Sequence, residues 1–126
     1  MTDKKSVLVV EDEQALQEAL KLKLTQAGFE VFVASSGEEA LELLQTMRPT
    51  LVSLDLLLPK MNGLEVLRQI RSDPKLVNLP VVVVSVSGGS EKLKQAFASN
   101  VLDYLIKSEY TIDSVVKRLE EILQGL

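Results

Sequence analysis

The chain has 126 residues, 46% of them hydrophobic, which is enough for the core of one compact domain but not of two. Its net charge of −4 argues against a nucleic-acid binder, which usually carries a basic face. It has neither cysteine nor histidine, which excludes disulfides, thiolate metal sites and histidine-based catalysis, so any bound metal must be an oxygen-liking cation.

The first half of the chain alternates β-rich runs with helical periodicity. The continuous apolar run 7–10 predicts a strand buried on both faces. A helix is predicted next, with Gly28 as its stop and an apolar face formed by Leu16, Ala19, Leu20, Leu24 and Ala27. A second strand is predicted over 31–34. Ser36 and Glu39 have the spacing of a capping box for a second helix, which carries Ala40, Leu41 and Leu44.

The second half continues this alternation. Strands are predicted over 51–54, 81–84 and 102–106, and the four valines of 81–84 give the strongest strand signal. Asn62 and Glu65 predict another capping box, before a helix that carries Leu64, Leu67 and Ile70. Ser90 is predicted to cap a fourth helix, with Leu93, Ala96 and Phe97. Thr111 is predicted to cap a fifth, whose apolar residues run from Ile112 to Leu123.

Five successive β–α units predict an α/β fold, with a parallel sheet covered by helices on both faces. At this length we expect a flavodoxin-like (βα)5 doubly wound sheet with strand order 2-1-3-4-5. We expect one domain over 1–126, with its core at about 5–123 and no output domain attached. The short polar N-terminus lacks the apolar run of a secretory signal, and no stretch has the length of a membrane span, so we expect a cytoplasmic protein that does not contact membranes.

Polar side chains follow four of the predicted strands. Glu11 and Asp12 end the first strand, Asp55 the third, Ser85 the fourth and Lys107 the fifth. Ligands of an open parallel sheet bind beyond the carboxyl ends of its strands, where the strand order reverses, so these side chains should converge. Three carboxylates in one place repel each other unless one is protonated or a cation joins them. With only oxygen ligands available, Mg²⁺ is the natural choice.

This set of side chains suits phosphoryl transfer. A carboxylate can act as the nucleophile and form an aspartyl phosphate, while an ammonium and a hydroxyl neutralise and hydrogen-bond phosphoryl oxygens. Each residue also has a structural interpretation. Glu11 and Asp12 could simply favour the N-terminus of the first helix, Ser85 could be an ordinary strand end, and Lys107 a solvated rim residue. The signal is the combination in this order along the chain.

The sequence resembles the receiver domain of two-component response regulators. The segments that carry the resemblance are 7–13, 54–63, 80–85 and 103–107, and the similarity runs from about Lys5 to Leu123. The resemblance implies that Asp55 is the phosphoacceptor. It also implies that Glu11, Asp12, Asp55 and the backbone carbonyl of Leu57 bind Mg²⁺. Ser85 would be the switch hydroxyl, Lys107 would pair with the phosphoryl group, and Tyr104 is either an aromatic switch or a plain strand aromatic.

The same resemblance implies partners. The phosphoryl donor would be a phosphohistidine of a sensor histidine kinase or a phosphotransfer protein. The downstream protein would bind in trans, through the fourth helix, fifth strand and fifth helix, and phosphorylation could also drive homodimer formation. No nucleic acid is expected as a partner. The chain would be a phosphoacceptor that assists its own transfer and hydrolysis, and not an enzyme.

The sequence departs from the family pattern at several positions. Val86 stands where a small residue is usual, and Ser108 stands where a proline usually follows the lysine. Leu57 and Ser87 flank the expected site, and Leu57 cannot guide a hydrolytic water, which favours a long-lived phosphorylated state. Gly88 and Gly89 predict a mobile loop into the fourth helix.

These departures leave one alternative open, a degenerate receiver that acts only as an interaction module. Other classes fit the sequence less well. A flavin or nucleotide binder needs a glycine- or hydroxyl-rich loop after the first strand, where this chain has Glu11, Asp12 and Glu13. A phosphatase of the haloacid-dehalogenase type needs a second aspartate at the position of Leu57.

Overall fold

The computed structural model describes residues 4–86 and 89–126. Five parallel strands form one sheet in the order β2-β1-β3-β4-β5, which confirms the predicted flavodoxin-like topology. The strands are β1 (Ser6–Val10), β2 (Glu30–Ala34), β3 (Leu51–Leu54), β4 (Val81–Ser85) and β5 (Asp103–Ile106). Ser87 and Gly88, which were expected to flank the site and to loosen the loop into the fourth helix, lie outside the described residues.

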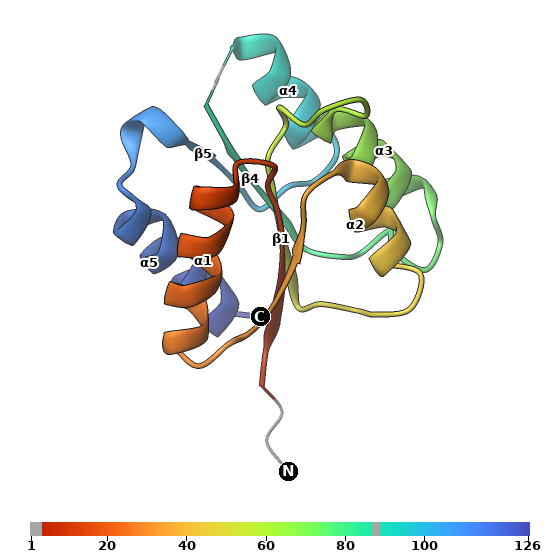
Figure 1. Cartoon of the computed structure of the whole chain (residues 1–126). Helices are drawn as coiled ribbons and strands as arrows, with labels where there is room; N and C mark the ends of the chain where they lie inside the picture. The colour runs from red at the N-terminus through yellow and green to blue at the C-terminus, as the bar shows by residue number, and fades with distance from the viewer. Residues whose placement is uncertain (1–3, 87–88) are drawn as a thin grey trace.

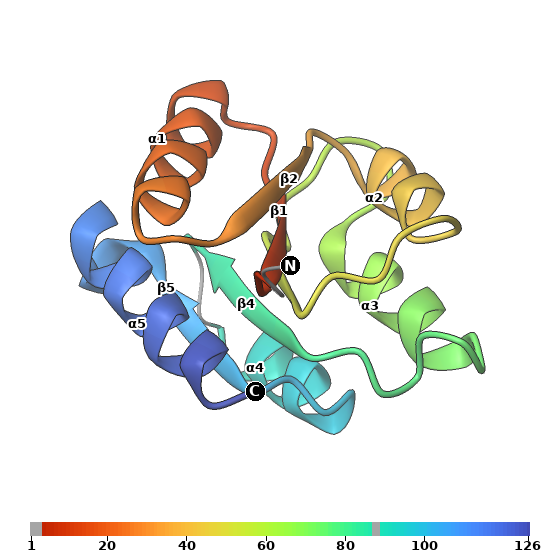
Figure 2. The same cartoon turned by 90° about the horizontal axis from the view of Figure 1, so that it is seen from below.

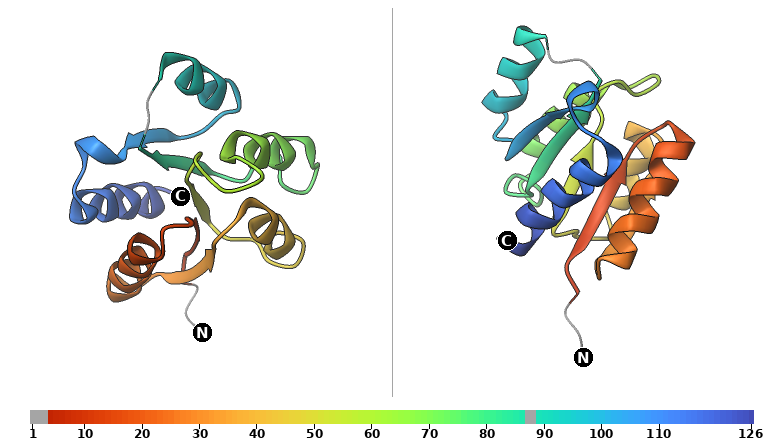
Figure 3. Two further views of the ribbon diagram at one scale, coloured as in Figure 1. Left: turned by 45° about the horizontal axis from the view of Figure 1, so that its top comes forward. Right: turned by 90° about the vertical axis from the view of Figure 1, so that its left-hand side faces the viewer.

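Helices cover both faces of the sheet, as Figures 1 and 2 show. They are α1 (Gln14–Gln26), α2 (Gly37–Leu43), α3 (Gly63–Ser72), α4 (Ser90–Ala98) and α5 (Ile112–Gln124), and a 3-10 turn, η1 (Lys107–Glu109), lies between β5 and α5. α1 and α5 pack side by side on one face, while α2, α3 and α4 cover the other. The left-hand view of Figure 3 shows α1 and α5 on one side of the strands and α2 and α3 on the other.

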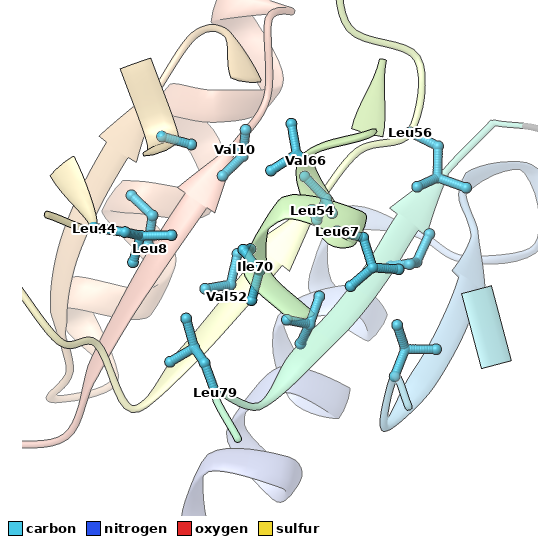
Figure 4. Close-up of a cluster of buried hydrophobic side chains, with 14 of the residues drawn as sticks. Leu8, Val10, Leu44, Val52, Leu54, Leu56, Val66, Leu67, Ile70 and Leu79 are labelled. Atoms are coloured by element: carbon cyan, nitrogen blue, oxygen red, sulfur yellow. The ribbon is translucent and has the colours of Figure 1, made fainter. Parts of the chain in front are cut away.

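Each face of the sheet has its own hydrophobic core because alternate side chains of a strand point to opposite faces. In β1, Val7 and Val9 pack toward α1 and α5, whereas Leu8 and Val10 pack toward α2 and α3. Figure 4 shows the second of these cores, in which Val66 and other residues of α3 lie against the strands. Burial of each such side chain contributes about 1.5–3 kcal/mol, so the sheet is a rigid platform for its loops.

The helix starts differ in detail from the predicted capping boxes. The Ser36 side chain accepts from the backbone N–H of Glu39 at 3.1 Å, but the Glu39 carboxylate returns to the N–H of Ser35 and not to that of Ser36. Asn62 caps α3 and Thr111 caps α5 as predicted. The Glu65 carboxylate instead turns to Arg68 and Gln69.

Three further sequence predictions need correction or support. Ser90 does not cap α4, because the helix begins one residue earlier than expected and Gly89 is its N-cap, without a side-chain hydrogen bond. Ala27 and Phe97 are exposed, although the sequence assigned both to apolar helical faces, and Ala27 is the C-cap of α1. Gly28 does end the first helix, with a positive φ of 101° that glycine adopts without strain.

Arg71 of α3 connects this helix to two neighbouring loops. The Arg71 guanidinium donates to the carbonyl oxygens of Val77 and Leu79 and to those of Ser99 and Asn100, at 2.7–3.1 Å. It therefore joins the end of α3 to the loop before β4 and to the end of α4. Within residues 4–86 and 89–126, no helix combines the length and the apolar character needed to cross a membrane.

Candidate functional site

The functional side chains gather at the carboxyl edge of the sheet. Glu11 directly follows β1 and Asp55 directly follows β3, and the two strands are neighbours with Val10 opposite Leu54. Backbone hydrogen bonds continue the ladder beyond the strands, since the N–H of Asp55 donates to Val10 at 3.0 Å. Both carboxylates are thus placed by the sheet register rather than by flexible loops.

Three carboxylates form one cluster at this edge. One oxygen each from Glu11, Asp12 and Asp55 lies within 4.8 Å of the others. Glu11 and Asp55 are only 2% and 4% exposed, whereas Asp12 is exposed. The structure therefore brings together the three acids that the sequence predicted to converge.

Lys107 lies between the two buried carboxylates. Its Nζ is 2.7 Å from Glu11 Oε1 and 3.1 Å from Asp55 Oδ2. Burial alone would lower the pKa of Lys107, but the hydrogen bond to Glu11 and the nearby negative charges outweigh it and raise that pKa above its ordinary value. Burial, with Asp55 adding to it, raises the pKa of Glu11 although Lys107 opposes this shift. The ammonium is therefore firmly charged and partly resolves the repulsion among the acids.

The backbone holds both buried carboxylates in place. Asp55 Oδ1 accepts from the N–H of Leu57 at 2.9 Å, and Glu11 Oε2 accepts from the N–H of Glu13 at 3.1 Å. The loop after β3 is also pressed against the start of α3, because a Cβ at Gly63 would lie 2.5 Å from Leu56 Cα and closer still to the carbonyl oxygen of Asp55. Only glycine permits this approach.

Ser85 ends β4 beside this cluster. It is 1% exposed, and within the described part of the chain its Oγ has no hydrogen-bond partner. Such a buried hydroxyl is costly to leave unsatisfied, so its retention suggests that it meets a ligand or a modified side chain in another state. Tyr104 lies on β5, opposite Val83 of β4, and is buried. Its burial, with the charge of Asp55 adding to it, raises the pKa of Tyr104 above its ordinary value.

The donor set fits a hard divalent cation. It offers carboxylate oxygens alone, and Mg²⁺ takes oxygen ligands and tolerates water in its remaining positions. Burial, more than the charge of Asp55, raises the pKa of Glu11, and Lys107 opposes this shift. Glu11, Asp12 and Asp55 are the side chains that would hold the ion.

Apolar side chains surround the mouth of the site. Leu57 and Val86 are 44% and 51% exposed. Val86 also lines a cavity of about 480 Å³ that extends from Lys107 along Leu16 of α1 and Ile112 of α5. Val86 and Lys107 therefore line the same cavity.

Sequence reasoning missed two features of the site. It assigned Lys107 to a phosphoryl group and did not foresee the contact with Glu11. It also passed over Gln17, whose side chain contacts the loop after β1. No local sequence pattern identifies either contact, because both join residues from separate elements.

A comparison with protein-family models matches residues 7–120 to the response regulator receiver domain. The chain belongs to this family. The receiver domain is 37% identical over 102 residues to the transcriptional regulatory protein AfsQ1 of Streptomyces coelicolor, covering 81% of this chain and 44% of that protein. It is 35% identical over 116 residues to the transcriptional regulatory protein CrdR of Helicobacter pylori, covering 92% and 54%. The chain thus spans about half the length of the curated relatives it matches.

Solved structures of similar proteins agree with this assignment. A CheY-like receiver domain protein from Methanospirillum hungatei has a TM-score of 0.88 at 22% identity, covering 98% of this chain and 96% of its own, which shows the shared fold. The phosphorylated cyanobacterial phytochrome response regulator RcpA has a TM-score of 0.78 at 33% identity, covering 97% and 90%. The Mn²⁺-bound form of response regulator Rcp1 has a TM-score of 0.78 at 32% identity, covering 96% and 90%.

Receiver domains are signalling domains of two-component systems rather than conventional enzymes, and the acidic cluster of this chain fits a phosphoacceptor site. The roles expected of the individual residues, the cytoplasmic location and the extent of the domain stay predictions.

Proposed function

We propose that this receiver domain accepts a phosphoryl group on Asp55 in a Mg²⁺-dependent reaction and relays it as a signal. The donor is a phosphohistidine of a sensor histidine kinase or a phosphotransfer protein. The observation that carries the proposal is the setting of Asp55. Its carboxylate is buried, is held by the N–H of Leu57, contacts Lys107 and lies within 4.8 Å of two further acids. Support also comes from RcpA, a relative whose structure is described as phosphorylated.

The residues divide the work of the transfer. The Asp55 carboxylate attacks phosphorus, the phosphorus–nitrogen bond of the donor breaks, and the imidazole nitrogen leaves with the electron pair. Lys107 neutralises a phosphoryl oxygen, and the free hydroxyl of Ser85 donates a hydrogen bond to another. Glu11, Asp12, Asp55 and the carbonyl of Leu57 would hold Mg²⁺, which would supply charge neutralisation for the phosphoryl oxygens.

Phosphorylation then changes the surface of the domain. Ser85 is drawn toward the phosphoryl group, and Tyr104 on the neighbouring strand follows it. The change reaches α4, β5 and α5, where a downstream protein binds in trans or a second copy of the chain associates. A differential stabilisation of a few kcal/mol between two states suffices for such a switch.

The phosphorylated state is long-lived. Leu57 and Val86 are exposed and apolar. Neither can hydrogen-bond a water molecule and direct it at the acyl phosphate. Slow hydrolysis follows, because general-base assistance is missing at both positions.

Intact-protein mass after incubation with acetyl phosphate tests the proposal, with and without Mg²⁺ and alongside Asp55→Asn. We expect one added phosphoryl group that requires both Mg²⁺ and Asp55. Absence of the adduct together with absence of Mg²⁺ binding would favour the alternative, a degenerate receiver that serves as an interaction module. Val86 and Ser108 favour this alternative because they depart from the family pattern.

A further inference from the structure

Gln17 reaches from α1 to the ends of two strands. Its Nε2 donates to the carbonyl oxygen of Glu11 at 2.8 Å and to Ser35 Oγ at 3.1 Å, with a longer contact to the carbonyl oxygen of Ala34 at 3.4 Å. Two of the three acceptors are backbone carbonyls, which cannot donate. The amide nitrogen, and not the amide oxygen, must therefore face this loop.

The carbonyl of Glu11 is part of the peptide unit that joins Glu11 to Asp12. Fixing this carbonyl fixes the plane of the peptide and with it the direction in which Asp12 leaves β1. Glu11 is held by burial and by Lys107, but Asp12 is exposed and gains little from packing. Its position in the carboxylate cluster depends on its backbone.

We propose that Gln17 is a positioning residue for the metal site, which holds the Glu11–Asp12 peptide so that the Asp12 carboxylate stays with those of Glu11 and Asp55. This inference rests on the proposed function, because it assumes that the cluster binds Mg²⁺. Gln17 does not touch the ion. It acts through the backbone, as outer-shell partners of metal ligands do.

The contact also joins the metal site to the start of α2. Ser35 receives the Gln17 amide on its hydroxyl, and its own N–H donates to Glu39 Oε1 at 2.8 Å. The chain of contacts therefore runs from Glu39 through Ser35 and Gln17 to the Glu11 carbonyl.

Gln17→Met tests the inference because methionine keeps the length and flexibility of glutamine but removes the donors. The matched control is Gln14→Met on the same helix, since the Gln14 amide donates to Glu18 one turn along and not to the loop. Calorimetric titration with Mg²⁺ gives the dissociation constant of each variant, and urea unfolding in EDTA gives its stability without metal. We expect Gln17→Met to weaken Mg²⁺ binding about tenfold, at the lower end of the range for outer-shell partners. Gln14→Met should leave it unchanged.

A second variant, Ser35→Ala, tests the hydrogen bond between Gln17 and Ser35 separately from those that Gln17 makes to the backbone carbonyls. Ser35→Ala removes one acceptor and leaves the two carbonyls, so a loss of about twofold to threefold is expected, a fraction of the outer-shell effect. In the Gln17→Met background the same change should have no further effect, because the shared contact is already gone. If Gln17→Met does not fold, Ser35→Ala decides alone.

The outcomes separate this inference from the proposed function. Wild-type Mg²⁺ affinity in Gln17→Met, or in Ser35→Ala where that variant decides alone, overturns the role of Gln17 while leaving phosphoryl acceptance intact. A loss of stability in EDTA without a loss of Mg²⁺ affinity also overturns it, because Gln17 would then be a structural residue only. Absence of Mg²⁺ binding by the unmodified chain overturns both proposals.

Discussion

Replacing Lys107 by methionine tests the electrostatics of the site. The side chain of Lys107 is 15% exposed, and it pairs with two carboxylates that are almost fully buried. Removing one partner of a buried ion pair costs about 3–5 kcal/mol, since the remaining charge is left unneutralised. The site opens to solvent at its mouth, so we expect the lower end, about 3 kcal/mol, at neutral pH in EDTA.

The stability loss caused by Lys107→Met should become smaller as the pH falls. Burial already raises the pKa of Glu11, and Lys107→Met removes the cation that opposes this shift. The folded variant then binds a proton that the unfolded chain does not, so its free energy of unfolding rises as the pH falls toward about 5. The unmodified chain gains less in this way, because Lys107 opposes the rise in the pKa of Glu11.

Urea unfolding followed by far-ultraviolet circular dichroism measures both effects, with Lys94→Met on the exposed surface of α4 as the control. A loss below about 1 kcal/mol at neutral pH would be the size of a surface ion pair and would contradict the account. The account would also be contradicted if the stability loss of Lys107→Met were no smaller at lower pH than at neutral pH.

Three further substitutions have distinct expected results. Gly63→Ala forces a Cβ against the backbone at Leu56, so it should lower the free energy of unfolding in urea by about 3 kcal/mol and slow phosphorylation. The control is Gly125→Ala, where a Cβ would meet no atom closer than 3.5 Å and the loss should be less than about 0.5 kcal/mol. Ser85→Ala removes an unpaired buried hydroxyl, so stability should be unchanged or rise by about 1 kcal/mol while the tyrosine spectral response to phosphorylation falls. An undiminished response would contradict the switch role. Arg71→Met leaves four carbonyls without their donor and should cost about 2–4 kcal/mol, and a melting temperature equal to that of the unmodified chain would refute this.

Sequence reasoning placed the main site residues because strand ends share an edge in a parallel sheet. Glu11, Asp55, Ser85 and Lys107 each follow or end an apolar run, and the strand order then decides which are neighbours. Strand 7–10 was recognisable because a strand covered on both faces is apolar throughout. The clustering of the acids followed from the topology, without any side-chain detail.

Contacts that depend on side-chain reach could not be predicted. Lys107 bonds Glu11 as well as Asp55, and the two pairs span 96 and 52 residues in sequence. Gln17 looks like any polar helical residue until the ends of β1 and β2 are placed beside it. The error at Ser90 has another cause, since Gly89 adopts the N-cap conformation without a side chain that could signal it.

The central claim is that Asp55 carries the phosphoryl group. Borohydride reduction of the acyl phosphate marks the modified residue, and peptide mass spectrometry then identifies it after incubation with acetyl phosphate and Mg²⁺. The account predicts the mark on Asp55 alone, with Glu11 and Asp12 unmodified. A mark on either of those two acids, or Mg²⁺-independent marking spread over exposed carboxylates, would contradict it.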